Sequence, residues 1–388
     1  MNRIVAFCLL IIYTNIYSQQ ANPNSAVFIP QGFSLQTLGS SGTSNIINDI
    51  SKISAVNPAS INEFNKISAG ISYELQTNID DAYIAGIGYK HIQNFTPQSF
   101  GIIIPINELK LGIGMRQKYN CGMDLGLIPI STTEQPYGTG EFFHPVYVTV
   151  IHSYSLIISY SFLDTNKGMN NLSIGIRLDY NRLHQYQDMS SFSIGLISYS
   201  PSWEAGFIYT INFNENQKLR FGISYENNIQ FREISSAEGA LVTEVPTAPG
   251  SNQTTPYVSN SFKSDMPEKV KVDLYLDPDP NFKFITAINY ILWDNIGNNF
   301  YNQFELSGNV VYSPKSILSS SIGFYSTGRK FKPDFYRLND RMNAFFITAG
   351  LKINFSYFNI NLAVADSHLL SGDAYKQTIG NIGIGFQL

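Results

Sequence analysis

The sequence predicts an all-β protein, a transmembrane antiparallel β-barrel of about 14 strands with an N-terminal plug in its lumen. Charged residues make up only 14% of the 388 residues, against roughly 25% in an ordinary soluble domain. Aromatic residues also reach 14%, and polar and apolar residues alternate along most of the chain. After the N-terminus there is no apolar stretch of about 20 residues, which excludes a helical membrane protein. The aromatic and β-branched content argues against disorder.

Residues 1–18 are expected to be a signal peptide. Arg3 precedes an unbroken apolar run, Ile4 to Tyr13, and a polar stretch then leads to Ser18. As a helix this run is too short for the hydrocarbon core of a bilayer. It is therefore typical of a secretory signal, with cleavage near Ser18. Cys121 is then the single cysteine of the mature chain, so no intrachain disulfide is expected.

Residues 19–66 precede the alternating pattern and are rich in Ser, Asn, Gly and Ile. They are too apolar to stay solvated, yet a unit of this size without disulfide or metal rarely folds alone. A barrel of 14 strands has a lumen wider than its own side chains fill. We therefore expect residues 19–66 to fold into the lumen as a plug, or hatch.

Residues 67–388 are expected to form the barrel in the cell outer membrane. From Tyr154 to Phe162 the even positions are Tyr, Leu, Ile, Tyr and Phe, whereas the odd positions are mostly Ser. The apolar face should contact lipid and the face with charged residues should line the lumen, because charges facing lipid are costly. Several candidate strands run for ten or more residues and begin or end in aromatic residues, which favours a barrel over a secreted soluble sandwich.

The connections set the strand count. Candidate strands lie at 67–76, 81–91, 98–104, 109–119, 145–163, 170–185, 200–213, 217–231, 268–277, 281–293, 300–313, 316–328, 343–355, 358–367 and 378–388. Long connections are expected at 120–144, 186–199, 232–267, 329–342 and 368–377. Bacterial barrels keep short turns on the periplasmic side and have an even number of strands. Either 67–76 and 81–91 form one bent strand, or one of them belongs to an outer loop, giving 14.

Two regions resemble the FadL/TodX family of outer-membrane transporters for hydrophobic compounds. The first comprises Leu38 to Gly42, Asp49 to Ser51 and Ala55 to Ser60, and it is similar to the N-terminal hatch of that family. The second is Met266-Pro267-Glu268 at the start of a strand, with Tyr290 and Trp293 closing the next strand. Many barrels end in an aromatic residue, whereas this chain ends in Leu388.

The resemblance implies uptake of small hydrophobic molecules, such as long-chain fatty acids or aromatic hydrocarbons, with lateral release into the membrane. An apolar ligand or lipid needs a partly apolar pocket, and we expect plug residues to line it. The candidates are Leu35, Leu38, Ile46, Ile47, Ile50 and Ile53. Asn57, Pro58 and Ala59 form the expected plug motif, in which Pro58 fixes the entry of the chain into the wall and Asn57 bonds buried backbone groups. The alternative is a simple turn or helix cap at Asn-Pro.

A second hypothesis is a structural or interaction barrel. The Ser-Gln end of the signal and the Asn-, Ile- and Tyr-rich composition suggest a Bacteroidetes-like source. There, barrels of this kind also resemble components of type IX protein secretion, which would imply a secretion-system protein partner. Loop 232–267 contains only Tyr257 and Phe262 as aromatic anchors, which argues against protein docking.

No enzyme activity, cofactor or metal is expected. The five histidines, His91, His144, His152, His184 and His368, show no metal-ligand spacing. The sequence Asp277-Pro278-Asp279-Pro280 favours a tight turn over a calcium site. A formal net charge of -4 gives no basic face for nucleic acid. Lumen charges such as Arg177, Asp179, Arg220, Glu226, Lys271 and Asp273 are expected to pair across strands.

Overall fold

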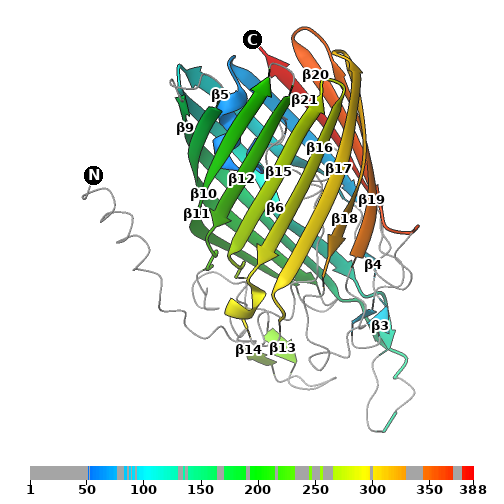
Figure 1. Ribbon diagram of the computed structural model, residues 1–388. Helices are drawn as coiled ribbons and strands as arrows, with labels where there is room; N and C mark the ends of the chain where they lie inside the picture. Colours follow the sequence, from blue (N-terminus) through cyan, green and yellow to red (C-terminus); the bar gives the residue numbers. More distant parts are fainter. Residues whose placement is uncertain are drawn as a thin grey trace, which may run out of the picture.

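The computed structural model shows a closed antiparallel β-barrel with strongly tilted strands (Figure 1). It describes residues 51, 53–76, 83–84, 87–88, 90–91, 94–129, 134–135, 139–163, 170–188, 193–214, 217–231, 244–246, 254–256, 265–297, 300–328, 344–369 and 378–388. The expected signal peptide, 1–18, and most of the expected plug lie outside these residues.

Fourteen strands form the wall. They are β1 (Ser68–Gln76), β5 (Asn94–Ile106), β6 (Leu109–Asp124), β9 (Val146–Leu163), β10 (Asn170–Asp188), β11 (Ser193–Asn214), β12 (Gln217–Glu226), β15 (Lys269–Asp279), β16 (Phe282–Ile291), β17 (Gln303–Lys315), β18 (Leu318–Thr327), β19 (Ala344–Asn354), β20 (Phe358–Asp366) and β21 (Thr378–Gln387). Each pairs with its neighbours in the chain, and β1 pairs with β21 to close the ring. The predicted 14-stranded barrel is confirmed.

The remaining elements that the structure describes are short. They are two 3-10 helices, η3 (Pro58–Glu63) and η5 (Trp293–Asn295), and seven strands, β2 (Tyr83–Ile84), β3 (Ile87–Gly88), β4 (Lys90–His91), β7 (Ile128–Pro129), β8 (Phe142–Phe143), β13 (Glu244–Pro246) and β14 (Thr254–Pro256). The labelled strands β3, β13 and β14 lie at the end of the barrel opposite the C-terminus (Figure 1). In the described part of the chain, no helix is both long and apolar enough to span a membrane.

The expected division between the two faces of the wall is confirmed. On β9 the side chains of Leu156 and Tyr160 are exposed on the outside, whereas Ser155 and Ser159 are buried inside. On β10 Leu178 is 48% exposed and the neighbouring Arg177 is fully buried. Because a strand turns alternate side chains to opposite faces, one period-2 pattern supplies both a lipid-facing surface and a polar lumen.

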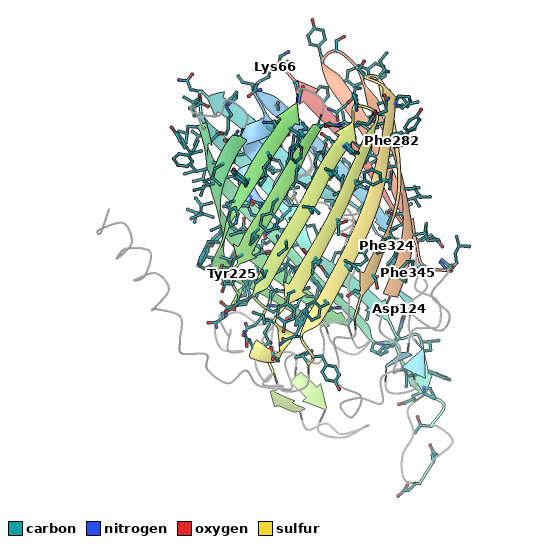
Figure 2. The ribbon with its side chains drawn as sticks, in the orientation of Figure 1. Lys66, Asp124, Tyr225, Phe282, Phe324 and Phe345 are labelled. Atoms are coloured by element: carbon teal, nitrogen blue, oxygen red, sulfur yellow. The ribbon has the colours of Figure 1, made fainter. Side chains whose placement is uncertain are left out.

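Among the labelled aromatic side chains, Phe282 lies toward one end of the barrel and Tyr225, Phe324 and Phe345 lie toward the other (Figure 2). The ring of Phe282 packs against that of Tyr312 in a tilted arrangement at the end that holds the C-terminus, with centroids 4.9 Å apart. Near the opposite end, the rings of Phe324 and Phe345 are stacked, with centroids 5.8 Å apart. Such belts mark the two membrane–water interfaces of a transmembrane barrel.

Two details of the predicted strands differ. Segment 81–91 is no part of the wall, because its described residues form β2, β3 and the short β4, which adds to the outer end of β6. Of the two predicted alternatives, one bent strand or an outer loop, the structure therefore adopts the outer loop for segment 81–91. The predicted long connection 186–199 is wrong, because β10 and β11 stay paired from Asn170 to Asp188. The polar residues that suggested a loop continue the hairpin beyond the other strands.

Candidate functional site

A short segment of chain, residues 53–64, lies inside the barrel and is here named the lumenal segment. Its helix η3 contacts β6, β9, β10 and β11. Asn57 is fully buried. Its Nδ2 donates to the carbonyl oxygens of Phe207 at 3.3 Å and Ile223 at 3.2 Å. Its Oδ1 accepts from the Ala59 amide at 3.0 Å. The Asn57 side chain thus joins the segment to the wall and also caps η3, whose first residue is Pro58.

Glycines on the inner face let the lumenal segment approach the wall. A Cβ atom on Gly175 would lie 2.5 Å from the Ala59 nitrogen and from the Pro58 carbonyl carbon. On Gly206 it would lie 2.2 Å from Asn57 Oδ1. Both distances are shorter than real Cβ contacts, so the lumenal segment can come this close to the wall only because these residues lack side chains.

The lumenal segment also has an apolar contact with the wall. Ile53, Ile61 and Phe64 pack with Ile103 and Ile157 in one buried cluster. Ile53, the sequence-predicted ligand-lining residue that the structure describes, is 1% exposed and contacts this wall. The other candidates, Leu35, Leu38, Ile46, Ile47 and Ile50, lie outside the described residues.

A network of charged side chains lies next to the lumenal segment, and it is farther than that segment from the C-terminal end of the barrel. It consists of Arg116, Lys118, Arg177, Lys271, Asp179, Glu204 and Glu226. Arg116 lies 3.0 Å from Asp179 and 2.7 Å from Glu226. Arg177 pairs with Glu204 and donates to the Val56 carbonyl at 2.9 Å. Because buried charges are tolerated only when paired and hydrogen-bonded, the network holds these side chains in fixed positions.

The expectation that lumen charges pair across strands is confirmed for part of the set. Lys271 lies 3.0 Å from Glu204 and 3.5 Å from Glu226. Arg220 instead pairs with Glu63 of η3. The charges therefore bind the lumenal segment to the wall as well as one strand to the next.

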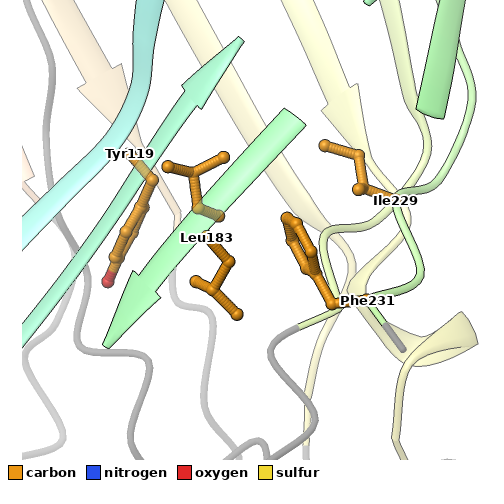
Figure 3. Packing of buried hydrophobic residues seen from close by; sticks show 5 residues of the cluster. Tyr119, Leu183, Ile229 and Phe231 are labelled. Atoms are coloured by element: carbon orange, nitrogen blue, oxygen red, sulfur yellow. The ribbon is translucent and has the colours of Figure 1, made fainter. Parts of the chain in front are cut away.

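Buried apolar side chains pack together at the outer end of the lumen, and Figure 3 shows the cluster around Leu183. Along β10 the inward positions run from Gly175 at η3, through Arg177 and Asp179, to Leu183. Leu183 packs with Tyr119, Ile151, Ile229 and Phe231. A second cluster is formed by Ile291, Trp293, Ile296 and Phe300, and Met266 contacts both clusters. We call these ten residues the outer apolar layer.

The outer apolar layer was missed in the sequence, although a signal for it exists. Ile151 and Leu183 occupy inward positions on strands whose other inward residues are mainly Ser, Asn, Arg and Asp. An apolar residue on the lumen side of the alternation is unusual for a polar lumen. Tyr119 was concealed by a register shift in β6 between Gln117 and Tyr119, which changes the face of the following residues.

The arrangement can bind an apolar molecule at its outer end and exclude ions further in. Aliphatic and aromatic side chains offer dispersion contacts to such a ligand, and the charged network and the lumenal segment obstruct the lumen beyond it. Among the described residues no group of three or more His, Cys, Asp or Glu side chains is placed to hold a metal ion.

Comparisons of sequence find no matching family model and no matching curated protein. Solved structures do match. The chain is similar to the CymD monoaromatic hydrocarbon channel, with a TM-score of 0.62 and 11% identity, covering 92% of this chain and 98% of that one. A Pseudomonas aeruginosa FadL homologue gives a TM-score of 0.61 and 11% identity over 93% and 99% of the two chains.

The Ralstonia pickettii toluene transporter TbuX is also similar, with a TM-score of 0.60 and 10% identity over 92% of this chain and 98% of the other. These structural neighbours are channels rather than enzymes. At such low identity the likeness establishes the fold, a FadL/TodX-type barrel. It agrees with the family resemblance seen in the sequence.

Proposed function

We propose that the protein is an outer-membrane channel for the uptake of small hydrophobic molecules. The observation that carries the proposal is the outer apolar layer, a set of buried aliphatic and aromatic side chains at the outer end of a polar lumen. A channel for ions gains nothing from such side chains, whereas a hydrophobic ligand leaves water by contacting them. The FadL/TodX-type fold supports the same function.

In this mechanism the outer apolar layer receives the ligand and the lumenal segment closes the path beyond it. We propose that residues 19–66 together form the plug, and that Asn57, Pro58 and Ala59 fix its end to the wall. Passage then requires the plug to move or the ligand to leave through the wall into the membrane. Leu35, Leu38, Ile46, Ile47, Ile50 and Ile53 remain proposed plug residues near the ligand path.

The alternative, a barrel that serves type IX protein secretion, is favoured by no observation on the described residues. The apolar side chains of the outer layer face the lumen and pack with one another, so they offer no surface for docking a folded protein.

The proposal is tested by uptake of radiolabelled long-chain fatty acid and radiolabelled toluene. The cells lack their own channels of this type and carry either the gene or an empty vector. We expect the protein to raise the initial uptake rate of at least one compound several-fold. Equal rates for both compounds, with the barrel present in the outer membrane, would contradict the proposal.

A further inference from the structure

A group of basic side chains lies on the outer surface of the wall, near the outer ends of β9 and β10. Arg182 of β10 and His152 of β9 are register partners, and His184 lies further along β10. The residues on either side of them point into the barrel and are buried, namely Ile151, Ser153, Asn181, Leu183 and Gln185. Because alternate side chains of a strand face opposite sides, Arg182, His152 and His184 face outwards. We call these three residues the basic patch.

The basic patch lies where the apolar band of the outer surface ends. From Leu172 to Tyr180 the outward side chains of β10 are aliphatic or aromatic. At about 3.3 Å per residue and a tilt of about 40°, these positions cover about 20 Å along the membrane normal, close to the roughly 25 Å band of a transmembrane barrel. Tyr180 stacks with Tyr199, with ring centroids 5.4 Å apart. Arg182 is the next outward residue of β10 and therefore lies at the level of the lipid headgroups.

Arg182 has unused hydrogen-bonding capacity. Among the described residues it forms no ion pair, and its buried Nε has no hydrogen-bond partner. Arg182 and His184 both repel a positive charge on His152, so the three side chains lie within electrostatic reach of one another. An anion with several acceptor oxygens satisfies such a group of donors.

Two carboxylates on the same sheet are too distant to neutralise the basic patch. Asp188 lies beyond Arg182 on β10, about 20 Å away at about 3.3 Å per residue. It accepts a hydrogen bond from the Tyr186 hydroxyl at 3.1 Å. Asp124 of β6 has the same register partner on β9 as Asp188, and it bonds to His144. The described parts of these strands therefore supply no anion to the basic patch.

We propose that the basic patch binds the phosphate group of an anionic lipid in the outer leaflet of the membrane. The planar guanidinium of Arg182 donates paired, charge-assisted hydrogen bonds to phosphate oxygens. The Cβ atoms of opposite residues on neighbouring strands lie about 5 Å apart, so the imidazole of His152 reaches the same phosphate. The acyl chains then lie along the apolar band below Tyr180. Free phosphate makes no contact with this band, which favours a lipid as the occupant. The site lies outside the lumen, so the inference goes beyond uptake.

The test is native mass spectrometry of the full-length protein, released from a non-ionic detergent after equilibration with a lipid. The probes are phosphatidic acid and diacylglycerol with the same acyl chains, which differ only by the phosphate. The test variant is Arg182→Gln with His184→Gln, and Arg182→Lys keeps the charge. The matched control is Lys66→Gln, which removes an exposed cation at the end of the barrel that holds the C-terminus (Figure 2). Heat-modifiable migration on gels verifies that every variant is folded.

We expect the double variant to bind phosphatidic acid about 5-fold more weakly than the intact protein, because it loses the guanidinium and one imidazole at the headgroup level. The control and Arg182→Lys should change this affinity less than about 3-fold, and diacylglycerol should bind equally weakly to all four proteins. Equal affinity for phosphatidic acid in a folded double variant, or the same loss in the control, would overturn the inference. Displacement of phosphatidic acid by an equal concentration of inorganic phosphate would overturn the assignment to a lipid.

Discussion

Gly175 shows how a single residue decides whether the lumen can be closed. It lies on the inner face of β10, where the backbone of the lumenal segment packs directly against the wall. The backbone of Pro58 and Ala59 occupies the space that a side chain would need. Asn57 then bonds to two carbonyl oxygens of neighbouring strands, so the segment is fixed by contacts that any bulk at Gly175 would break.

We predict that Gly175→Val displaces the lumenal segment and leaves the barrel intact, because the change affects no interstrand hydrogen bond. Single-channel conductance in planar bilayers should rise clearly above that of the intact protein. Gly195→Val is the control, since nothing lies within 4 Å of a Cβ at that position. Unchanged conductance in a folded Gly175→Val protein would show that this contact does not keep the lumen closed.

Arg177 is a fully buried charge of the charged network, and it pairs with Glu204 and Asp179. We predict that Arg177→Leu lowers the free energy of unfolding by about 3–5 kcal/mol, because it removes one of the two cations that pair with the buried Glu204 and also removes the donor to the Val56 carbonyl. Adding Glu204→Gln to this variant should restore part of the loss. Urea titration in detergent measures both values, and a double variant no more stable than Arg177→Leu would contradict this explanation.

At the scale of elements, the wall and the lumenal segment have different roles. The wall closes through β1 and β21 and through the continuous pairing of all strands between them. The segment adds no hydrogen-bonded ladder, but it fills the inner face of β6 and β9 to β11. The barrel should therefore form without it.

We predict that deleting residues 21–60 yields a folded, heat-modifiable barrel with a conducting lumen. A 14-stranded ring is too wide for its own side chains to seal, so conductance should rise from near zero to a porin-like value. Planar-bilayer recording of intact and truncated proteins measures the difference. If both conduct equally little, residues 21–60 are not the plug.

The outer apolar layer provides its own reporter, Trp293, which packs near Phe300 and donates to Gln303 at 3.0 Å. Trp203 is the other tryptophan of the chain, and Trp203→Phe leaves Trp293 alone. We predict a saturable change in Trp293 emission when toluene is added to this variant in detergent. A linear response without saturation would indicate that toluene only partitions into the micelle.

The alternation in sequence was sufficient to predict the wall, because each face of a strand is set by its own residues. Ser155 and Leu156 reveal their faces without knowledge of any other strand. The layers inside the lumen depend on register, which brings Arg116, Arg177 and Glu204 from three strands to one level. The bulge near Gln117 and the extended hairpin at Asp188 also leave no signature in the sequence of a single strand. The bulge concealed that Tyr119 faces the lumen, and the hairpin was predicted as the long connection 186–199.

For the whole molecule, the structure combines an apolar outer surface, a polar lumen and an apolar layer at the outer end of that lumen. The polar side chains of the lumen are compatible with water and with paired charges. Only the outer apolar layer favours a hydrophobic ligand over water. The proposed function therefore requires that hydrophobic ligands enter the barrel through this layer.

The most direct measurement is the initial uptake rate of radiolabelled fatty acid and toluene by cells that carry the intact protein, Leu183→Asp or Gln185→Glu. Leu183→Asp places a charge in the middle of the outer apolar layer, whereas Gln185→Glu adds a charge at the next inward position on the same strand. We predict uptake near the empty-vector rate for Leu183→Asp and near the intact rate for Gln185→Glu. If a folded Leu183→Asp protein supports uptake at the intact rate, hydrophobic molecules do not pass through the outer apolar layer, and the central claim is wrong.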